Sequence, residues 1–298
     1  MRFHQALTFL PTLDALALAQ VVDAQGYDGV YVSDHMFFPK HLSSPYTYST
    51  RDDGAPFWEP DTPWPEPWCF ISAMAAVTTT LRFTTGVYVA PARDLVTVAK
   101  QVGTAAVLSG GRVNLGVGAG WCKEEFDATG QDFSTRGRRL DDMIPALRAI
   151  LRPGWVEYHG PYYDLPLLRM EPAPPAPVPI YGGGHSAPAL RRAATLCDGW
   201  IAAGAYTPDE ARTHLTELHA ALRRAGRDGA PFDIFLSLKA PPDADLYRSF
   251  AEEFGVTDIL CAPWMGARLP EDASPDARLR AWAEASERFA EHIVAALR

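Results

Sequence analysis

The chain has 298 residues, 47% of them hydrophobic and 21% charged, which is the composition of a globular protein long enough to bury a large core. Its 27 basic and 36 acidic residues give a formal net charge of −9, and it has no run of Lys and Arg that would bind nucleic acid. No apolar run resembles a signal peptide or a membrane span, and the four cysteines have no CxxC spacing, so we expect a cytoplasmic protein with no metal, nucleic-acid or membrane partner.

Short β-type runs alternate with longer helical runs along most of the chain. In chain order we predict strand 3–9, helix 13–25, strand 29–32, helix 68–79, strand 82–89, helix 94–108, strand 113–117, helix 136–151, strand 179–181, helix 187–196, strand 199–202, helix 209–225, strand 232–238, helix 245–254, strand 257–261 and helix 276–297. Eight strands that each precede a helix predict a single α/β domain over 1–298, a (β/α)8 TIM barrel. A doubly wound open sheet is the alternative architecture.

Two segments interrupt this alternation. Residues 36–67 form a long loop rich in aromatic residues and prolines, which follows the second strand. Loops of this length usually serve as lids or binding loops, although the aromatic residues of this one can also simply pack on the barrel. The aromatic stretch 155–163 predicts a small inserted hairpin before the fifth strand.

Chemistry in such barrels takes place at the C-terminal ends of the strands. The second strand ends in Ser33-Asp34-His35, where a carboxylate beside an imidazole can orient and tune a proton-transfer group. The alternative is a structural histidine that packs beneath the long loop.

Two glycine-rich segments follow strands and are candidates for binding phosphate. Residues 116–121, Gly-Val-Gly-Ala-Gly-Trp, lack the third glycine of a dinucleotide-binding fingerprint, which excludes a Rossmann motif. Residues 182–188, Gly-Gly-Gly-His-Ser-Ala-Pro, open a helix, where free N–H groups and the helix dipole favour an anion. A tight turn with an ordinary helix cap is the alternative for this second segment.

Together these stretches resemble the bacterial-luciferase-like superfamily. The matching segments, which occur in the order of the family, are 29–35 (GVYVSDH), 108–112 (LSGGR), 116–121 (GVGAGW), 124–126 (EEF), 136–139 (RGRR), 179–184 (PIYGGG) and 197–200 (CDGW). No single segment is decisive, but the ordered set is specific and covers most of the chain up to about residue 204.

The resemblance implies a barrel whose C-terminal mouth holds a flavin-type cofactor. It places the ring on a bulge of the third strand with a cis peptide bond at Val87-Tyr88, and it assigns proton transfer to His35, oriented by Asp34. The residues expected to bind the cofactor are Val87, Tyr88, Gly118, Gly120, Gly182, Gly183, Gly184 and Ser186. Trp64 and Trp68 are expected to flank the substrate, and the family implies a homodimer.

The cofactor expected from the resemblance is the deazaflavin coenzyme F420, with FMN as the alternative. Ala119 stands where the sugar-phosphate dehydrogenases of the family carry a glutamate, so a sugar-phosphate substrate is not indicated, although Glu124 or Glu125 can take that place. Arg93 and Lys123 are candidates for binding the anionic tail of F420.

The expected activity is hydride transfer between F420 and a small organic substrate. An FMN-dependent monooxygenase with a partner reductase is the alternative. A metal-dependent barrel hydrolase or isomerase and a cofactor-binding protein without catalysis are the further possibilities from other classes.

Overall fold

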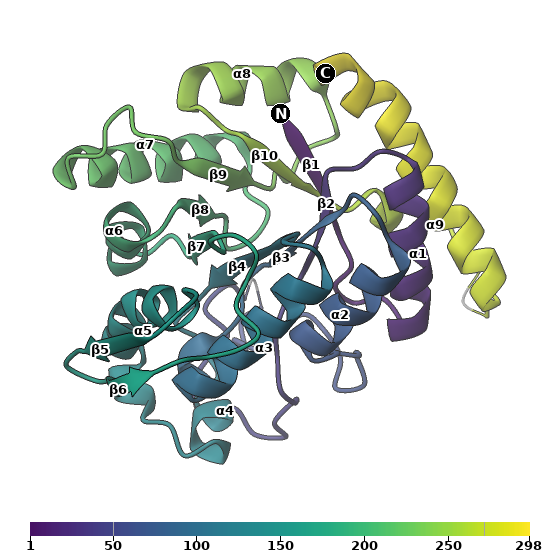
Figure 1. Cartoon of the computed structure of the whole chain (residues 1–298). Coiled ribbons are helices and arrows are strands. Elements are labelled where there is room, and N and C mark those ends of the chain that lie inside the picture. Colours follow the sequence, from purple (N-terminus) through teal and green to yellow (C-terminus); the bar gives the residue numbers. More distant parts are fainter. Residues whose placement is uncertain (50, 271) are drawn as a thin grey trace.

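The computed structural model describes residues 1–49, 51–270 and 272–298 and contains a closed barrel of parallel strands (Figure 1). Around the barrel, the strands follow the order β1-β10-β9-β8-β7-β4-β3-β2. They are β1 (Arg2–Ala6), β2 (Gly29–Val32), β3 (Arg82–Thr85), β4 (Val113–Val117), β7 (Ile180–Gly183), β8 (Gly199–Ile201), β9 (Asp233–Leu236) and β10 (Asp258–Cys261). The predicted (β/α)8 barrel is therefore confirmed, and the open sheet is excluded.

Helices surround the strands and cover their outer face (Figure 1). They are α1 (Thr12–Ala24), α2 (Pro67–Val77), α3 (Leu95–Leu108), α4 (Lys123–Ala128), α5 (Arg136–Ile150), α6 (Ala187–Leu196), α7 (Pro208–Arg224), α8 (Ala244–Phe254) and α9 (Pro275–Phe289). None of the helices in the described part of the chain has the length and apolar character needed to cross a membrane.

Side chains alternate along each strand between the barrel interior and the layer beneath the helices, as the pleat of a strand requires. Phe3 of β1 points outward and packs edge-on against Tyr247 and Phe289 of the surrounding helices. Its neighbour His4 points inward against Gly29, where a Cβ atom would lie 2.4 Å from His4 Nδ1. The main hydrophobic core therefore lies between the strands and the helices.

Capping side chains set the starts of several helices. Asp94 accepts a hydrogen bond from Thr97 N at 2.8 Å, and Glu66 accepts one from Cys69 N at 2.7 Å. Thr207 and Glu210 form a reciprocal capping box at the start of α7. These bonds satisfy backbone N–H groups that have no partner within the helix.

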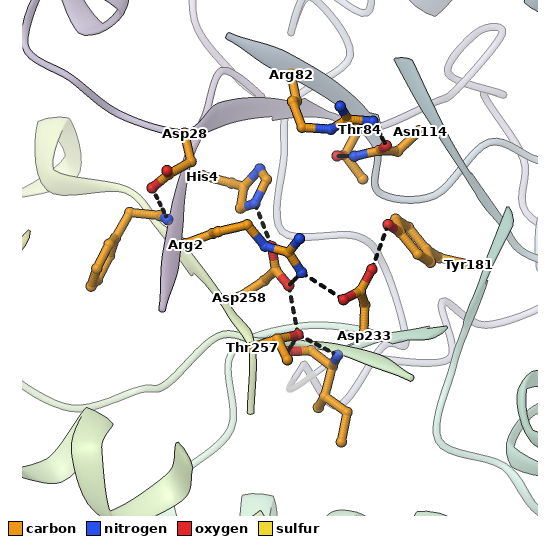
Figure 2. A network of polar contacts seen from close by, with 12 residues as sticks. Arg2, His4, Asp28, Arg82, Thr84, Asn114, Tyr181, Asp233, Thr257 and Asp258 are labelled. Atoms are coloured by element: carbon orange, nitrogen blue, oxygen red, sulfur yellow. Dashed lines mark hydrogen bonds and ion pairs between the residues drawn. The ribbon is translucent and has the colours of Figure 1, made fainter. Parts of the chain in front are cut away.

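The N-terminal face of the barrel is closed by a network of charged side chains (Figure 2). Arg2 contacts Asp233 at 2.6 Å and Asp258 at 2.7 Å, and His4 Nε2 lies 2.7 Å from Asp258. Tyr181 donates to Asp233 at 2.8 Å. This network joins the first strand of the chain, β1, to β7, β9 and β10. It lies at the face of the barrel that usually contributes to stability rather than to chemistry.

Two hollows of about 340 and 420 Å³ also lie at this N-terminal face. The first is lined by residues that include Arg148, Asp198 and Asp233, and the second lies beside Arg2 and Thr257. Both are on the side of the barrel away from its C-terminal mouth.

The predicted hairpin is present as β5 (Val156–His159) and β6 (Asp164–Leu168), which pair antiparallel beside α5. Asp142 of α5 holds it by accepting from Tyr158 OH at 2.5 Å and from Tyr162 N at 2.7 Å. The chain between β2 and α2 contains no helix or strand among its described residues, which matches the predicted long loop.

Candidate active site

His35 lies just beyond the C-terminal end of β2, at the mouth of the barrel. Its Nδ1 atom lies 2.9 Å from Glu125 Oε1, and Met36 N donates to the same oxygen at 2.8 Å. Because a carboxylate only accepts, the Nδ1 atom of His35 carries the proton in this contact. Nε2 is then the nitrogen of the neutral ring that is free to exchange a proton.

The prediction that Asp34 orients His35 is wrong. Asp34 accepts from Val89 N at 2.9 Å and from both terminal nitrogens of Arg93 at 2.8 Å. Burial raises the pKa of Asp34, while Arg93 and the Val89 N–H favour its charged form. Adjacent residues of an extended chain point in opposite directions, so Asp34 turns under the β3 bulge while His35 faces Glu125.

Aromatic rings of the long loop and of the segment after β4 enclose His35. Its ring centroid lies 5.0 Å from that of Trp58, 4.8 Å from that of Trp64 and 5.6 Å from that of Trp121. Tyr46 packs on Trp58 at 5.0 Å and on Trp121 at 4.9 Å. We call Tyr46, Trp58, Trp64 and Trp121 the ring cage.

The structure brings Trp64 to His35 but not Trp68. Trp68 belongs to α2, is 2% exposed and packs edge-on against Tyr88 at 5.5 Å. Because α2 lies on the outside of the barrel, Trp68 faces the core beneath the mouth. The expectation that Trp68 flanks a substrate therefore has no support in its position.

A cis peptide bond is present at the end of β3, but between Gly86 and Val87 and not at Val87-Tyr88 as predicted. Val87 rather than Tyr88 is thereby directed to the mouth, and Tyr88 is fully buried and donates to Gln101 Oε1 at 3.1 Å. The sequence does not distinguish a cis bond at Gly86-Val87 from one at Val87-Tyr88. In both cases an apolar side chain lies on each face of the strand.

Gly118 and Gly183 make room for Val87. A Cβ atom on Gly118 would lie 2.4 Å from Val87 Cγ2, and one on Gly183 would lie 2.3 Å from Val87 Cγ1. We predicted that these two glycines approach a phosphate. The packing of Val87 by itself already requires that neither position carries a side chain. Val87 therefore sits between β4 and β7 as the surface at the bottom of the mouth.

The remaining predicted cofactor glycines have different surroundings. Gly120 has φ +83°, and a Cβ atom there would lie 2.5 Å from Val89 Cγ1. Gly182 faces outward, where a Cβ atom would lie 3.0 Å from Ala193 of α6. Gly184 has φ +108°, a conformation that favours glycine, and leads directly into α6. Of these three, Gly184 is placed best to approach a ligand.

Ser186 is the N-cap residue of α6, is exposed, and makes no side-chain capping bond. The first N–H groups of a helix have no partner within the helix and lie at its positive end. Pro188 of α6 has no N–H, so the hydroxyl of Ser186 and the N–H groups of Ala187 and Ala189 form the set of hydrogen-bond donors, next to Gly184. Such a set fits a phosphate group.

A family model for luciferase-like monooxygenases matches residues 10–246. The chain belongs to this luciferase-like family. An uncharacterised protein of Mycobacterium tuberculosis is 35% identical over 296 residues, which cover 99% of both chains.

Solved structures share the fold of this luciferase-like chain at low sequence identity. The monooxygenase RslO1 from Streptomyces bottropensis has a TM-score of 0.72 and 15% identity and covers 99% of both chains. The coenzyme F420-dependent tetrahydromethanopterin reductase from Methanopyrus kandleri has a TM-score of 0.68 and 14% identity, with 100% of this chain and 99% of that chain covered. These two likenesses show a shared fold, and the match to the family model is what places the chain among the luciferase-like monooxygenases.

The residues at the mouth fit the flavin-type cofactors of the luciferase-like family. Val87 offers an apolar surface for a flat ring, and Gly184 and Ser186 with the start of α6 offer donors for a phosphate. The two cations considered for an anionic tail are already paired, Arg93 with Asp34 and Lys123 with Asp127 at 2.5 Å. These two pairs therefore give no reason to prefer the longer tail of F420.

From the sequence, Glu125 was expected only as a replacement for the missing glutamate, and Trp58 and Trp121 were not predicted as neighbours of His35. The partner of His35 is 90 positions away along the chain. The only signal in the sequence was the acidic pair that follows the 116–121 motif, at the start of a short helix. That helix, α4, was not predicted as an element.

Proposed function

We propose that this chain is an oxidoreductase that holds coenzyme F420 at the C-terminal mouth of its barrel and reduces or oxidises a small organic substrate. When bound, the deazaflavin ring supplies the hydride chemistry. The observation that supports the proposal most strongly is the bond between His35 Nδ1 and Glu125, which leaves His35 Nε2 free at the mouth. A proton must enter or leave the substrate together with the hydride, and a histidine suits this task near neutral pH.

In this proposal each group has a separate task. Glu125 is 1% exposed and fixes the ring of His35 by accepting its Nδ1 proton. Val87 supports the flat ring, and Ser186 with the start of α6 holds the phosphate. The ring cage excludes water from His35, so that the proton passes between Nε2 and the substrate.

The second candidate is an FMN-dependent monooxygenase. The match to a family of luciferase-like monooxygenases and the likeness in fold to the monooxygenase RslO1 favour it. It uses the same mouth and the same phosphate site. It differs from the F420-dependent oxidoreductase in that it requires oxygen and a source of reducing equivalents.

The experiment that tests the proposal is a pair of fluorescence titrations of the purified protein, with F420 and with FMN. Tight binding of F420 and weak binding of FMN are expected, with turnover that does not depend on oxygen. Preference for FMN with oxygen-dependent turnover would move the assignment to the monooxygenase. Binding of neither cofactor would reject both candidates.

A substitution at His35 tests the assigned chemistry. His35→Ala removes the proton-exchanging nitrogen but leaves Val87 and Ser186 in place, so turnover should fall by about a hundredfold or more while the Kd of the cofactor stays within about twofold. The same titration and a turnover assay measure both quantities. Full activity of the variant would remove His35 from the mechanism.

A further inference from the structure

Two histidine rings lie face to face beside the start of α6. His185 follows β7 and Gly184, and His214 comes from α7, which packs beside α6 (Figure 1). The two ring centroids are 4.6 Å apart, and the ring planes differ by 3°. His185 immediately precedes Ser186, so it belongs to the segment that offers donors to a phosphate. Two protonated rings at this separation repel each other, so the pair holds one positive charge more readily than two.

Tyr206, which precedes α7, determines which nitrogen of His185 carries the proton. The hydroxyl oxygen of Tyr206 accepts from Ala203 N at 3.0 Å and lies 3.0 Å from His185 Nδ1. The hydroxyl has one hydrogen, which it donates to His185 Nδ1, so that Nε2 carries the proton of the neutral ring. His185 Nε2 therefore adds an N–H donor to the phosphate-binding segment.

The second ring of the pair has a nitrogen without a partner. His214 Nδ1 is buried and makes no hydrogen bond with residues 1–49, 51–270 and 272–298. Glu217 Oε2 lies 3.7 Å from it, which is too far for a good hydrogen bond but close enough for an ion pair with a protonated ring. A buried polar atom left unpaired is unfavourable, and a proton on Nδ1 would gain this carboxylate as its partner.

The aromatic groups around the pair are uncharged. Burial lowers the pKa of His185, and the neighbouring His214 contributes to this effect, so His185 is neutral at pH 7. Tyr48 of the long loop packs edge-on against His185 at 5.3 Å. Burial raises the pKa values of Tyr48 and Tyr206, so both hydroxyl groups stay protonated.

The charged groups around His214 come from its own helix and from the segment after β9. Glu210 lies one turn before His214, and hydrogen bonds from Thr207 lower the pKa of this carboxylate. Glu217 lies one turn after His214, and Lys239 contributes to the lowered pKa of Glu210. Two carboxylates and one ammonium group give this region a net negative charge, to which a phosphate bound at α6 would add.

We propose that the pair of His185 and His214 is a proton-linked subsite for the phosphate group of the cofactor. His185 Nε2 donates to a phosphate oxygen, and the pair takes up one proton from the solvent at His214 Nδ1, where Glu217 accepts it in an ion pair. The inference rests on the proposed function and adds that the affinity for the cofactor depends on pH. Because an anion stabilises the protonated form of the pair, the cofactor should bind more tightly at pH 6 than at pH 8.

The test is calorimetry of the full chain with F420 and with FMN at pH 6.5, in two buffers that differ in their enthalpy of ionisation. The change of the binding heat with the buffer gives the number of protons that are taken up. His214→Phe keeps a flat ring against His185 but cannot bind a proton. With the cofactor that binds, the wild type should take up about half a proton more than this variant.

The Kd provides a second readout. The ratio of the Kd of His214→Phe to that of the wild type should rise by about fivefold between pH 8 and pH 6. Using this ratio removes the titration of the phosphate itself, which is common to both proteins.

Two further variants complete the test. Glu217→Gln changes an exposed side chain, so the fold is not at risk, and the loss of its charge should reduce the extra proton uptake by about half. His292→Gln is the matched control, because it removes an exposed histidine after α9 and should keep the wild-type uptake. Thermal melts verify that all three variants fold.

Equal proton uptake in the wild type, His214→Phe and Glu217→Gln would overturn the inference, and so would a Kd ratio that does not change with pH. A chain that binds F420 or FMN with either of these results loses only the proton-linked subsite. Binding of neither cofactor rejects the proposed function and this inference with it.

Discussion

At the scale of single residues, the site depends on which carboxylate contacts His35. Asp34 is the neighbour in the chain, but Glu125 is the neighbour in space, at 2.9 Å from Nδ1. The sequence allowed His35 to be placed at the mouth, because a strand end is a local feature. It did not allow its partner to be identified, because the partner comes from a helix 90 positions later whose position depends on the folded barrel.

The first prediction concerns this contact. Glu125→Ala removes both the acceptor for His35 Nδ1 and the negative charge, so turnover should fall by about a hundredfold, whereas Glu125→Gln keeps an acceptor oxygen and should lose about tenfold. The readouts are turnover as a function of pH and the Kd of the cofactor.

Asp127→Asn is the matched control, because Asp127 is an exposed carboxylate of the same helix that contacts Lys123. It should leave the turnover and the pH profile of the wild type unchanged. Equal loss of turnover in Glu125→Gln and Glu125→Ala would contradict the role of the acceptor oxygen of Glu125.

At the scale of elements, the alternation of strands and helices was predicted well, since β2, β4 and α6 have the expected bounds. The first and third strands are shorter than predicted. Apolar residues continue beyond β1 and β3, but there the chain turns to line the mouth, at Phe9 and at Val87. An alternation of hydrophobic residues indicates burial but not strand pairing. The residues that line the mouth of the barrel are buried although they do not pair in the sheet.

The second prediction tests how β3, β4 and β7 fit together around Val87. Gly183→Ala places a Cβ atom 2.3 Å from Val87 Cγ1, so the free energy of unfolding should fall by about 1–3 kcal/mol. Val87→Ala removes that Cγ atom, so adding Gly183→Ala in this background should cost much less. Chemical denaturation of the four proteins in a double-mutant cycle measures the coupling. Equal cost of Gly183→Ala in both backgrounds would contradict the contact.

At the scale of the whole molecule, the two faces of the barrel have different tasks. The N-terminal face carries the network of Arg2, His4, Asp233 and Asp258, and the C-terminal face carries the site. The sequence showed the barrel but not this network, since its members come from strands at both ends of the chain. Burial alone would raise the pKa of Asp258, but hydrogen bonds from His4 and Arg2 outweigh burial and hold the pKa below its ordinary value.

The third prediction follows from that lowered pKa. A carboxylate whose pKa is lower in the folded state stabilises the fold above its unfolded pKa of about 3.9, and this stabilisation is lost as the pH falls through the folded value. Asp258→Asn should reduce the free energy of unfolding at pH 7 by about 3 kcal/mol, and its stability should vary less with pH below about 4 than that of the wild type. Denaturation curves at pH 7, 4 and 3 provide the measurement.

Asp245→Asn is the control for this prediction, because Asp245 forms an exposed pair with Arg248. The Asp245→Asn protein should have the same free energy of unfolding as the wild type, with the same dependence on acid pH. An Asp258→Asn protein with unchanged stability at pH 7 would show that the network contributes little.

In the proposed function, the C-terminal mouth holds the phosphate of a flavin-type cofactor at the start of α6. Ser186 tests it directly, because it is an exposed N-cap residue where both Asp and Asn are good helix caps. Ser186→Asp adds a negative charge that repels phosphate without harming the helix, and Ser186→Asn keeps the site neutral.

A fluorescence titration of the wild type and these two variants, with the cofactor that the protein binds, measures this effect. We expect Ser186→Asp to raise the Kd by about tenfold or more, while the Kd of Ser186→Asn stays within about threefold of that of the wild type. Binding by Ser186→Asp that is as tight as that of the wild type would contradict it.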